Sequence, residues 1–315
     1  MIAIGSVLLS MPALAQEASK ADAPKSATAG ALPKPNTAAD PIVVTTLKAP
    51  DRATVRNLVQ AITPVVPFEE PLPRFDAPVC FASTGLDRPT MERIGDRLAE
   101  NAMLAGLQLA GSGCKPNVAI LFVNDVDRAV KMLLARRWWL FGDRLPAEVR
   151  TITHEAGPVR AWSNSELRSA QGMPRGEAVL AKNLPVNEGV VMSSPTASRI
   201  EARVQRDMLV SIVLVERAAV IGKTTTQVAD YLSMRTLAVI RPNHASGRDS
   251  ILTLFDADMT EPPEALTVFD RGYLKGLYAG NANQYAALKI GKITRTILAG
   301  APPRVPAVTA REHPE

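Results

Sequence analysis

The chain has 315 residues, a hydrophobic content of 46% and a formal net charge of +5. This composition predicts a globular protein with a real core. The basic charge does not indicate a nucleic-acid partner, because Arg and Lys are scattered and only 4% of the residues are aromatic, which leaves few platforms for stacked bases. The charge fits a preference for anionic envelope surfaces instead.

The first fifteen residues predict a signal peptide. An apolar stretch ends at Ala13-Leu14-Ala15, which fits the small-x-small cleavage rule and would make Gln16 the first mature residue. No Lys or Arg precedes the stretch, so whether Met1 is the true start stays open, and a short buried segment is the alternative. We expect a protein of the bacterial periplasm or the medium.

The sequence after residue 15 predicts no membrane span and a single folded domain between a linker and a tail. The longest later apolar stretch, Met208 to Ile221, is interrupted by Glu216 and Arg217 and falls short of the roughly 18 residues that a span needs. Residues 16–40 have the Ala, Pro, Lys and Ser composition of a flexible linker. We expect one α+β domain over residues 41–300 and a disordered tail over 301–315.

The domain begins with a predicted amphipathic helix over Asp51 to Ile62, followed by extended chain over Pro64 to Pro73. A second helix is expected from an N-cap at Thr90 to about Leu107. The continuous apolar run Val118 to Val123 is typical of a buried strand.

Cys80 and Cys114 are the whole cysteine inventory, and in an exported chain such a pair predicts a disulfide. The bond would join the start of the second helix to the start of the buried strand. A metal site or a catalytic thiol is a weaker interpretation, because two Cys cannot complete a tetrahedral zinc site and no His lies close in the sequence.

A third helix is expected over Asp127 to Leu140, and it ends with Trp138 and Trp139 beside two Arg. This pair is a candidate interface, either as a ligand platform or as an interfacial anchor. Packing in the core at a helix end is the favoured interpretation, because Trp usually supplies bulk. Short strands and loops are expected between Leu145 and Ile200, among them strands over Val149 to Thr153 and Val159 to Trp162.

The last third carries the strongest pattern. Met208 to Val215 is rich in β-branched residues and predicts a strand. A helix capped by Thr224 or Thr225 follows, then a loop and the turn Ser250-Ile251-Leu252. Thr267 and Asp270 form an acidic capping box for a final helix that ends near Tyr278.

The order of strand, helix, Ser-Ile-hydrophobic turn and Leu-Thr-x-x-Asp-x-x-x-Leu-x-x-Leu-Tyr resembles the metal-binding half of metzincin or matrixin-like peptidases. The resemblance covers about Met208 to Gly280 and implies a zincin-like mixed sheet with packed helices. In those enzymes the central helix carries HExxHxxGxxH, and a turn with Met lies beneath the metal.

The central helix lacks the ligands that the resemblance implies. In the register that keeps the apolar residues of the helix on its buried side, the metal-site positions are degenerate. They are occupied by Thr226, Gln227, Asp230 and Thr236, and one Asp cannot supply the ligand set. A shift by one residue offers Gln227 and Tyr231 instead. Because a zinc peptidase needs three ligands and a Glu base, we expect no metal, no cofactor and no catalytic residues.

The three histidines do not supply a site. His154 is followed by Glu155, but Pro158 stands where HExxH requires its second His, and His244 and His313 lie in a polar loop and in the tail. The leading hypothesis is a non-catalytic exported protein that binds a peptide, an envelope polymer or a partner protein. The alternatives are a metal-independent hydrolase that uses Asp230, His154 or His244, and a purely structural envelope component.

Overall fold

A computed structural model describes residues 51–67, 70–172, 198–241, 245 and 247–301, all of which belong to one compact unit, Leu47–Glu315. The predicted signal peptide, the linker and the tail beyond residue 301 lie outside the described residues. The described part is a mixed α+β structure with one disulfide, as the sequence predicts.

Four strands form one mixed sheet in the order β1-β2-β4-β3. Strands β1 (Phe81–Thr84), β2 (Val118–Val123) and β4 (Val204–Glu216) are parallel to one another. Strand β3 (Val159–Ser169) pairs antiparallel with β4 and is an edge strand. It begins at the predicted residue but is longer than expected.

Seven α-helices and several 3-10 turns complete the described residues. The helices are α1 (Arg52–Ile62), α2 (Arg88–Ala105), α3 (Val126–Arg137), α4 (Pro146–Thr153), α5 (Thr225–Leu237), α6 (Val268–Tyr278) and α7 (Ala286–Gly300). The turns are η1 (Trp138–Phe141), η2 (Arg217–Val220), η4 (Gly247–Asp249) and η5 (Ile251–Thr253). Within the described ranges, none of the helices has the length and apolar content needed to cross a membrane.

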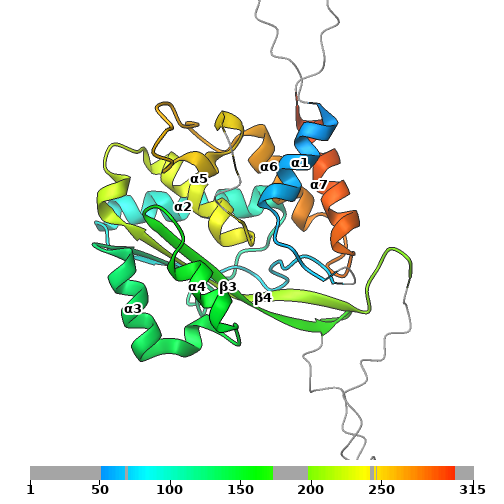
Figure 1. Cartoon of the computed structure of the whole chain (residues 1–315), viewed down its shortest axis with the longest axis horizontal. Helices are drawn as coiled ribbons and strands as arrows, with labels where there is room; N and C mark the ends of the chain where they lie inside the picture. The colour runs from blue at the N-terminus through cyan, green and yellow to red at the C-terminus, as the bar shows by residue number, and fades with distance from the viewer. Residues whose placement is uncertain (1–50, 68–69, 173–197, 242–244, 246, 302–315) are drawn as a thin grey trace, which may run out of the picture. The chain divides into compact units, whose positions relative to one another are not determined.

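The sheet separates two hydrophobic cores, and β4 contributes to both because successive side chains of a strand point to opposite faces. Val213 and Val215 belong to the larger core, which contains buried residues of α1, α2, α5, α6 and α7. Ile212 and Leu214 belong to the smaller core, with residues of α3 and Phe141 of η1. Figure 1 shows α5 and α3 on opposite sides of the sheet.

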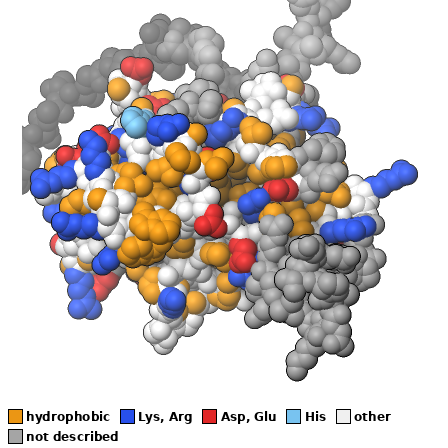
Figure 2. All heavy atoms as spheres, turned by 60° about the horizontal axis from the view of Figure 1, so that its bottom comes forward, with side chains coloured by type: hydrophobic (Ala, Val, Ile, Leu, Met, Phe, Trp, Pro, Cys, Tyr) orange, Lys and Arg blue, Asp and Glu red, His pale blue; other side chains and the backbone are white. Residues whose placement is uncertain are grey.

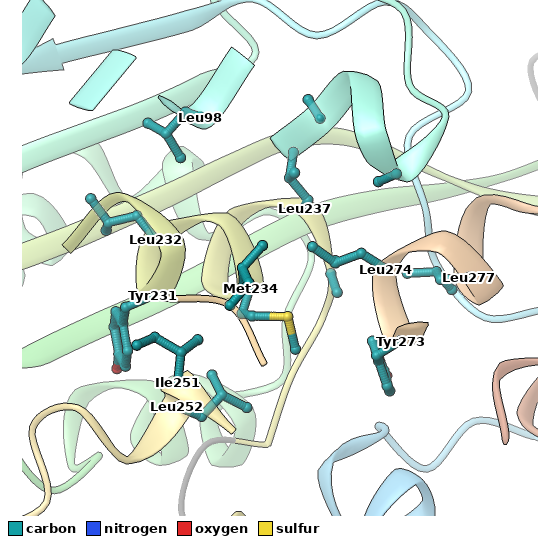
Figure 3. Close-up of a cluster of buried hydrophobic side chains, with 14 of the residues drawn as sticks. Leu98, Tyr231, Leu232, Met234, Leu237, Ile251, Leu252, Tyr273, Leu274 and Leu277 are labelled. Carbon is teal, nitrogen blue, oxygen red and sulfur yellow. The ribbon is translucent and has the colours of Figure 1, made fainter. Parts of the chain in front are cut away.

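Helix α5 is at the centre of the larger core, and every residue from Gln227 to Leu237 is buried. Thr224, one of the two predicted caps, is the N-cap of the helix, and Gln227 completes the capping box. Figure 3 shows Leu232, Met234 and Leu237 of this helix among side chains of α2, η5 and α6. A helix buried on all sides is held by its neighbours rather than by its intrinsic propensity.

Helices α6 and α7 approach closely because α6 has glycines one turn apart. A Cβ atom on Gly276 would lie 2.6 Å from the Cα atom of Ile293, and one on Gly272 would lie 2.7 Å from the Cα atom of Ile297. Such contacts are closer than packed atoms allow. Helix α7 itself was not among the sequence predictions.

The disulfide joins Cys80 and Cys114, whose Cα atoms are 6.2 Å apart. The pairing is the predicted one, but its position in the fold differs from the expectation. Cys80 directly precedes strand β1, which the sequence analysis missed, so the bond fixes the entry to β1 and not to α2. Closing this 34-residue separation stabilises the fold by about 3–4 kcal/mol in the chain-entropy estimate.

Two further predictions on local structure were wrong. Asp87, not Thr90, caps α2, because its carboxylate accepts the N–H of Thr90 and Pro89 suits the first turn. Val149 to Thr153 is the end of helix α4 rather than a strand. Pro146 opens that helix, and the Glu148 carboxylate accepts the backbone N–H of Leu145.

Candidate functional site

A cleft of about 440 Å³ lies beside α5. It is enclosed by the segment that leads into β3, by two side chains of α5 and by the chain after η5. Its lining residues are Glu155, Ala156, Gly157, Pro158, Val159, Tyr231, Arg235, Leu252, Phe255, Asp256, Ala257, Asp258 and Met259. Since Val159 is the first residue of β3, the cleft lies at the end of an edge strand.

A buried ion pair forms the floor of this cleft. The Arg235 side chain is only 3% exposed, and its Nη2 lies 2.7 Å from Oε1 and 3.0 Å from Oε2 of Glu155. Its Nη1 donates to the Tyr231 hydroxyl at 2.9 Å. Burial raises the pKa of Tyr231, so its phenol stays protonated near neutral pH. The three groups satisfy one another and hold Arg235 in place.

The rest of the cleft is apolar on one wall and acidic at its rim. Phe255 packs edge-on against Tyr231 with ring centroids 4.8 Å apart. Asp256 and Asp258 are exposed, and within the described ranges neither carboxylate has a hydrogen-bonding or ion-pair partner. Burial, and then the neighbouring charge of Asp258, raise the pKa of Asp256. The cleft therefore contains three carboxylates and a single guanidinium.

The four degenerate metal-site positions do not line this cleft. The Gln227 amide accepts the N–H of Thr224 and donates to the carbonyl of Pro263. Thr236 is buried and donates to the Leu232 carbonyl, while Thr226 lies half-buried in the first turn. Tyr231, which the shifted register places at a ligand position, is the residue that faces the cleft.

Asp230 is buried and connects three elements of the larger core. Its two oxygens accept hydrogen bonds from Nε and Nη2 of Arg97 at 2.8 and 3.1 Å. They also accept hydrogen bonds from Nδ2 of Asn101 at 2.7 Å and from the backbone N–H of Leu266 at 2.6 Å. The side-chain bond to Asp230 is the largest cause of the raised pKa of Arg97. With its acceptor positions filled, Asp230 positions α2 and α6 against α5.

Asp270 organises the turn that forms one side of the cleft. Its carboxylate accepts the Ser250 hydroxyl at 2.5 Å, the backbone N–H of Ile251 at 2.8 Å, and the N–H and hydroxyl of Thr267 at 2.9 Å each. Burial raises the pKa of Asp270 even though these bonds oppose the shift. The predicted capping box is present, and it also fixes the η5 turn from which Leu252 reaches the cleft.

The remaining candidate residues lie elsewhere. His154 is exposed at the end of α4, with Nδ1 2.9 Å from both the Thr153 hydroxyl and the Arg150 carbonyl. His244 and His313 are outside the described residues. No group of three or more His, Cys, Asp or Glu that could hold a metal ion occurs in the part of the chain that the structure describes.

Trp138 and Trp139 are far from buried, at 67% and 51% exposure, so the favoured prediction of packing in the core was wrong for them. Neither lines the cleft. Sequence reasoning missed Glu155 and Arg235 as partners, because they are 80 residues apart and neither belongs to a motif. The only usable signal was the spacing of Tyr231 and Arg235 by one helical turn.

Comparison of the chain with protein-family models, curated proteins and solved structures found no match.

Proposed function

We propose that this chain is an exported, non-catalytic protein with a zincin-like scaffold, and that it binds an extended peptide or a peptide segment of a partner protein in the cleft beside α5. The single observation that carries the proposal is that cleft, with its ordered floor, apolar wall and acidic rim. An envelope polymer remains the alternative ligand, and a metal-independent hydrolase the alternative activity.

The proposal for the scaffold is supported by the order of the elements. Strand β4, helix α5, the η5 turn and helix α6 follow one another in the order expected for a metzincin-like peptidase. Asp270 connects the turn to the start of α6 through hydrogen bonds. Of the positions that would carry metal ligands, Gln227 takes part in capping, Asp230 forms an ion pair with Arg97, and Thr236 donates to a backbone carbonyl. These contacts support a scaffold that serves for binding.

The shape of the site supports an extended ligand. An edge strand has backbone N–H and C=O groups that a further strand can pair with, and such pairing supplies affinity without specifying a sequence. Strand β3 is at the edge of the sheet and starts at the cleft. The carbonyls of Val159 and Ser163 already accept hydrogen bonds from Arg160 and Arg144, so a peptide that runs along β3 would pair with other backbone groups of this edge. Such a peptide would bring one side chain into the cleft.

The charges support a basic side chain in that position. Arg235 is already paired with Glu155, which leaves the carboxylates of Asp256 and Asp258 at the rim for a ligand cation. Leu252, Phe255 and Met259 would contact the aliphatic stem of a Lys or Arg. Rim charges chiefly affect association and discrimination between partners.

Fluorescence anisotropy tests the proposal with three short labelled peptides that differ only in containing Lys-Arg, Gln-Gln or Glu-Glu at the centre. We expect the Lys-Arg peptide to bind most tightly and its affinity to fall with salt. An Asp256→Asn, Asp258→Asn double variant should weaken this binding about fivefold to tenfold. Glu92→Gln on α2, an exposed site outside the cleft, serves as the matched control.

Equal binding of the three peptides, or binding that the double variant leaves unchanged, would contradict the proposal. Mass spectrometry of the same mixtures tests the non-catalytic part. Intact peptides are expected after long incubation. Cleavage that copurifies with the protein and is lost in the Arg235→Lys variant would show a hydrolase instead.

A further inference from the structure

The face of the molecule on the other side of the sheet carries exposed tryptophans on a rigid turn. Trp138 and Trp139 open η1, and Phe141 of the same turn is buried and stacks on Trp162 with ring centroids 4.6 Å apart. Two side chains of one four-residue turn are thus in solvent while a third anchors the turn to the sheet. This arrangement differs from a helix end packed in a core.

The turn is fixed by hydrogen bonds as well as by packing. The Leu140 carbonyl accepts Nε1 of Trp162 at 2.8 Å and Nδ2 of Asn164 at 3.0 Å. Arg144 donates to the Phe141 carbonyl at 2.8 Å, to Oδ1 of Asn164 at 2.6 Å and to the Ser163 carbonyl. Because the backbone of the turn is held at Leu140 and Phe141, less backbone ordering is required when Trp138 and Trp139 bind a partner.

The elements next to this turn in the sequence carry further exposed apolar side chains. Met132 of α3 is 50% exposed, and Leu145, just before α4, is 67% exposed. Figure 2 shows hydrophobic side chains gathered on the side of the molecule that carries α3, with Lys and Arg and also some Asp and Glu side chains beside them. Contiguous exposed apolar surface with a polar rim is typical of an interaction site.

Basic side chains outnumber acidic ones on this face. Arg128, Lys131, Arg136 and Arg150 are exposed, and none of them forms an ion pair within the described ranges. Arg137 lies over the ring of Trp139 at 5.2 Å. By contrast, Asp127 is engaged by Arg160 and Glu148 by the N-terminus of α4. Asp125 and Asp143 are also exposed on this side, so between residues 125 and 150 six Arg and Lys side chains stand against four Asp and Glu side chains. The face keeps a net positive charge, which suits an anionic surface.

We propose that the face formed by Met132, Trp138, Trp139 and Leu145, with its basic rim, docks on an anionic lipid bilayer. Indole rings favour the boundary between lipid headgroups and acyl chains, and Lys and Arg are attracted to anionic headgroups. The docking is peripheral and reversible, since a few side chains enter the boundary and no segment spans it. It is independent of the cleft, which lies on the α5 side of the sheet.

Vesicle cosedimentation tests this docking with protein that begins at Gln16, the first residue after the predicted cleavage site. The vesicles contain phosphatidylcholine alone or with phosphatidylglycerol as a quarter of the lipid. Binding is expected only with phosphatidylglycerol, with a blue shift of tryptophan emission. A Trp138→Ser, Trp139→Ser variant should lose at least about tenfold in partitioning, and Arg136→Ser about fivefold.

The matched control is a Met103→Ser, Leu104→Ser variant on α2, where both side chains are similarly exposed. It should bind the anionic vesicles as the parent chain does. All variants should keep the parent's melting temperature, because the changed side chains are mainly in solvent. Absence of binding by the parent chain, or equal binding by the tryptophan variant, would overturn the proposal. Self-association that the tryptophan variant abolishes, without vesicle binding, would overturn it in favour of a protein interface.

Discussion

The two sides of the sheet use their polar and apolar groups in opposite ways. On the α5 side, charged groups such as Asp230, Arg235 and Asp270 are buried and fully engaged, and a hollow remains beside them. On the α3 side, Trp138 and Trp139 are left in solvent on a turn that is otherwise well fixed. Buried charged groups whose hydrogen bonds are all satisfied within the protein have a structural role. Exposed apolar groups on an ordered turn indicate a site that binds a ligand or a surface.

The largest expected effect comes from removing the charge that joins three elements on the α5 side. Asp230→Ala should lower the free energy of unfolding by about 3–5 kcal/mol, because Arg97, Asn101 and the Leu266 N–H lose a buried acceptor. Urea denaturation measures this change. Asp143→Ala on the other side removes an exposed carboxylate and should change stability by less than about 0.5 kcal/mol. An equal loss of unfolding free energy in the two variants would contradict the structural role assigned to Asp230.

The close approach of α6 and α7 gives the next effect. Gly276→Ala places a methyl group against the backbone of Ile293 and should cost about 2–3 kcal/mol in thermal or urea unfolding. Gly291→Ala on α7 is the control, since a Cβ there has no neighbour within 4 Å. That control should gain about 0.5–1 kcal/mol from higher helix propensity. A neutral result at Gly276 would mean that the two helices are less tightly packed than described.

A smaller effect concerns pH. Lys289 of α7 is buried and donates to the carbonyls of Ala279 and Asn281, near the C-terminal end of α6. Burial first, and then the nearby charges of Arg74 and Lys292, lower its pKa to about 7. Between pH 7 and the usual pKa of a lysine the unfolded chain therefore binds more protons than the folded chain. Stability should rise by about 1–2 kcal/mol from pH 7 to pH 9.

Denaturation at several pH values measures this slope. Lys289→Met should remove the rise, whereas Lys131→Met on the exposed face of α3 should keep it. A slope that persists in Lys289→Met would assign the pH dependence to other groups.

Much of the fold followed from local patterns, and the misses have physical causes. Helix α5 was predictable because Thr224 and Gln227 form a capping box, and strands β2 and β4 because of their apolar runs. Strand β1 is only four residues long, too short for a periodic signal. Helix α4 was mistaken for a strand because the β-branched residues near its end outweighed the signal of Pro146.

The candidate site was less predictable than the fold. Every residue in the second half of α5 is buried, so periodicity could not separate the residues that face the cleft from those that face the core. Asp230 was a reasonable candidate as the one carboxylate of the helix, yet long-range bonds to α2 engage it. The pairing of Arg235 with Glu155 depends on tertiary packing that a single sequence does not display.

Binding of a basic peptide segment in the cleft beside α5 is tested most directly by a nuclear magnetic resonance titration. The isotope-labelled chain is titrated with the short Lys-Arg peptide, and backbone amide shifts are followed. Saturable shifts are expected at Glu155, Val159, Tyr231 and the residues from Phe255 to Met259, with none at α3. Shifts that are absent from these residues, or that saturate elsewhere on the molecule, would contradict binding in the cleft.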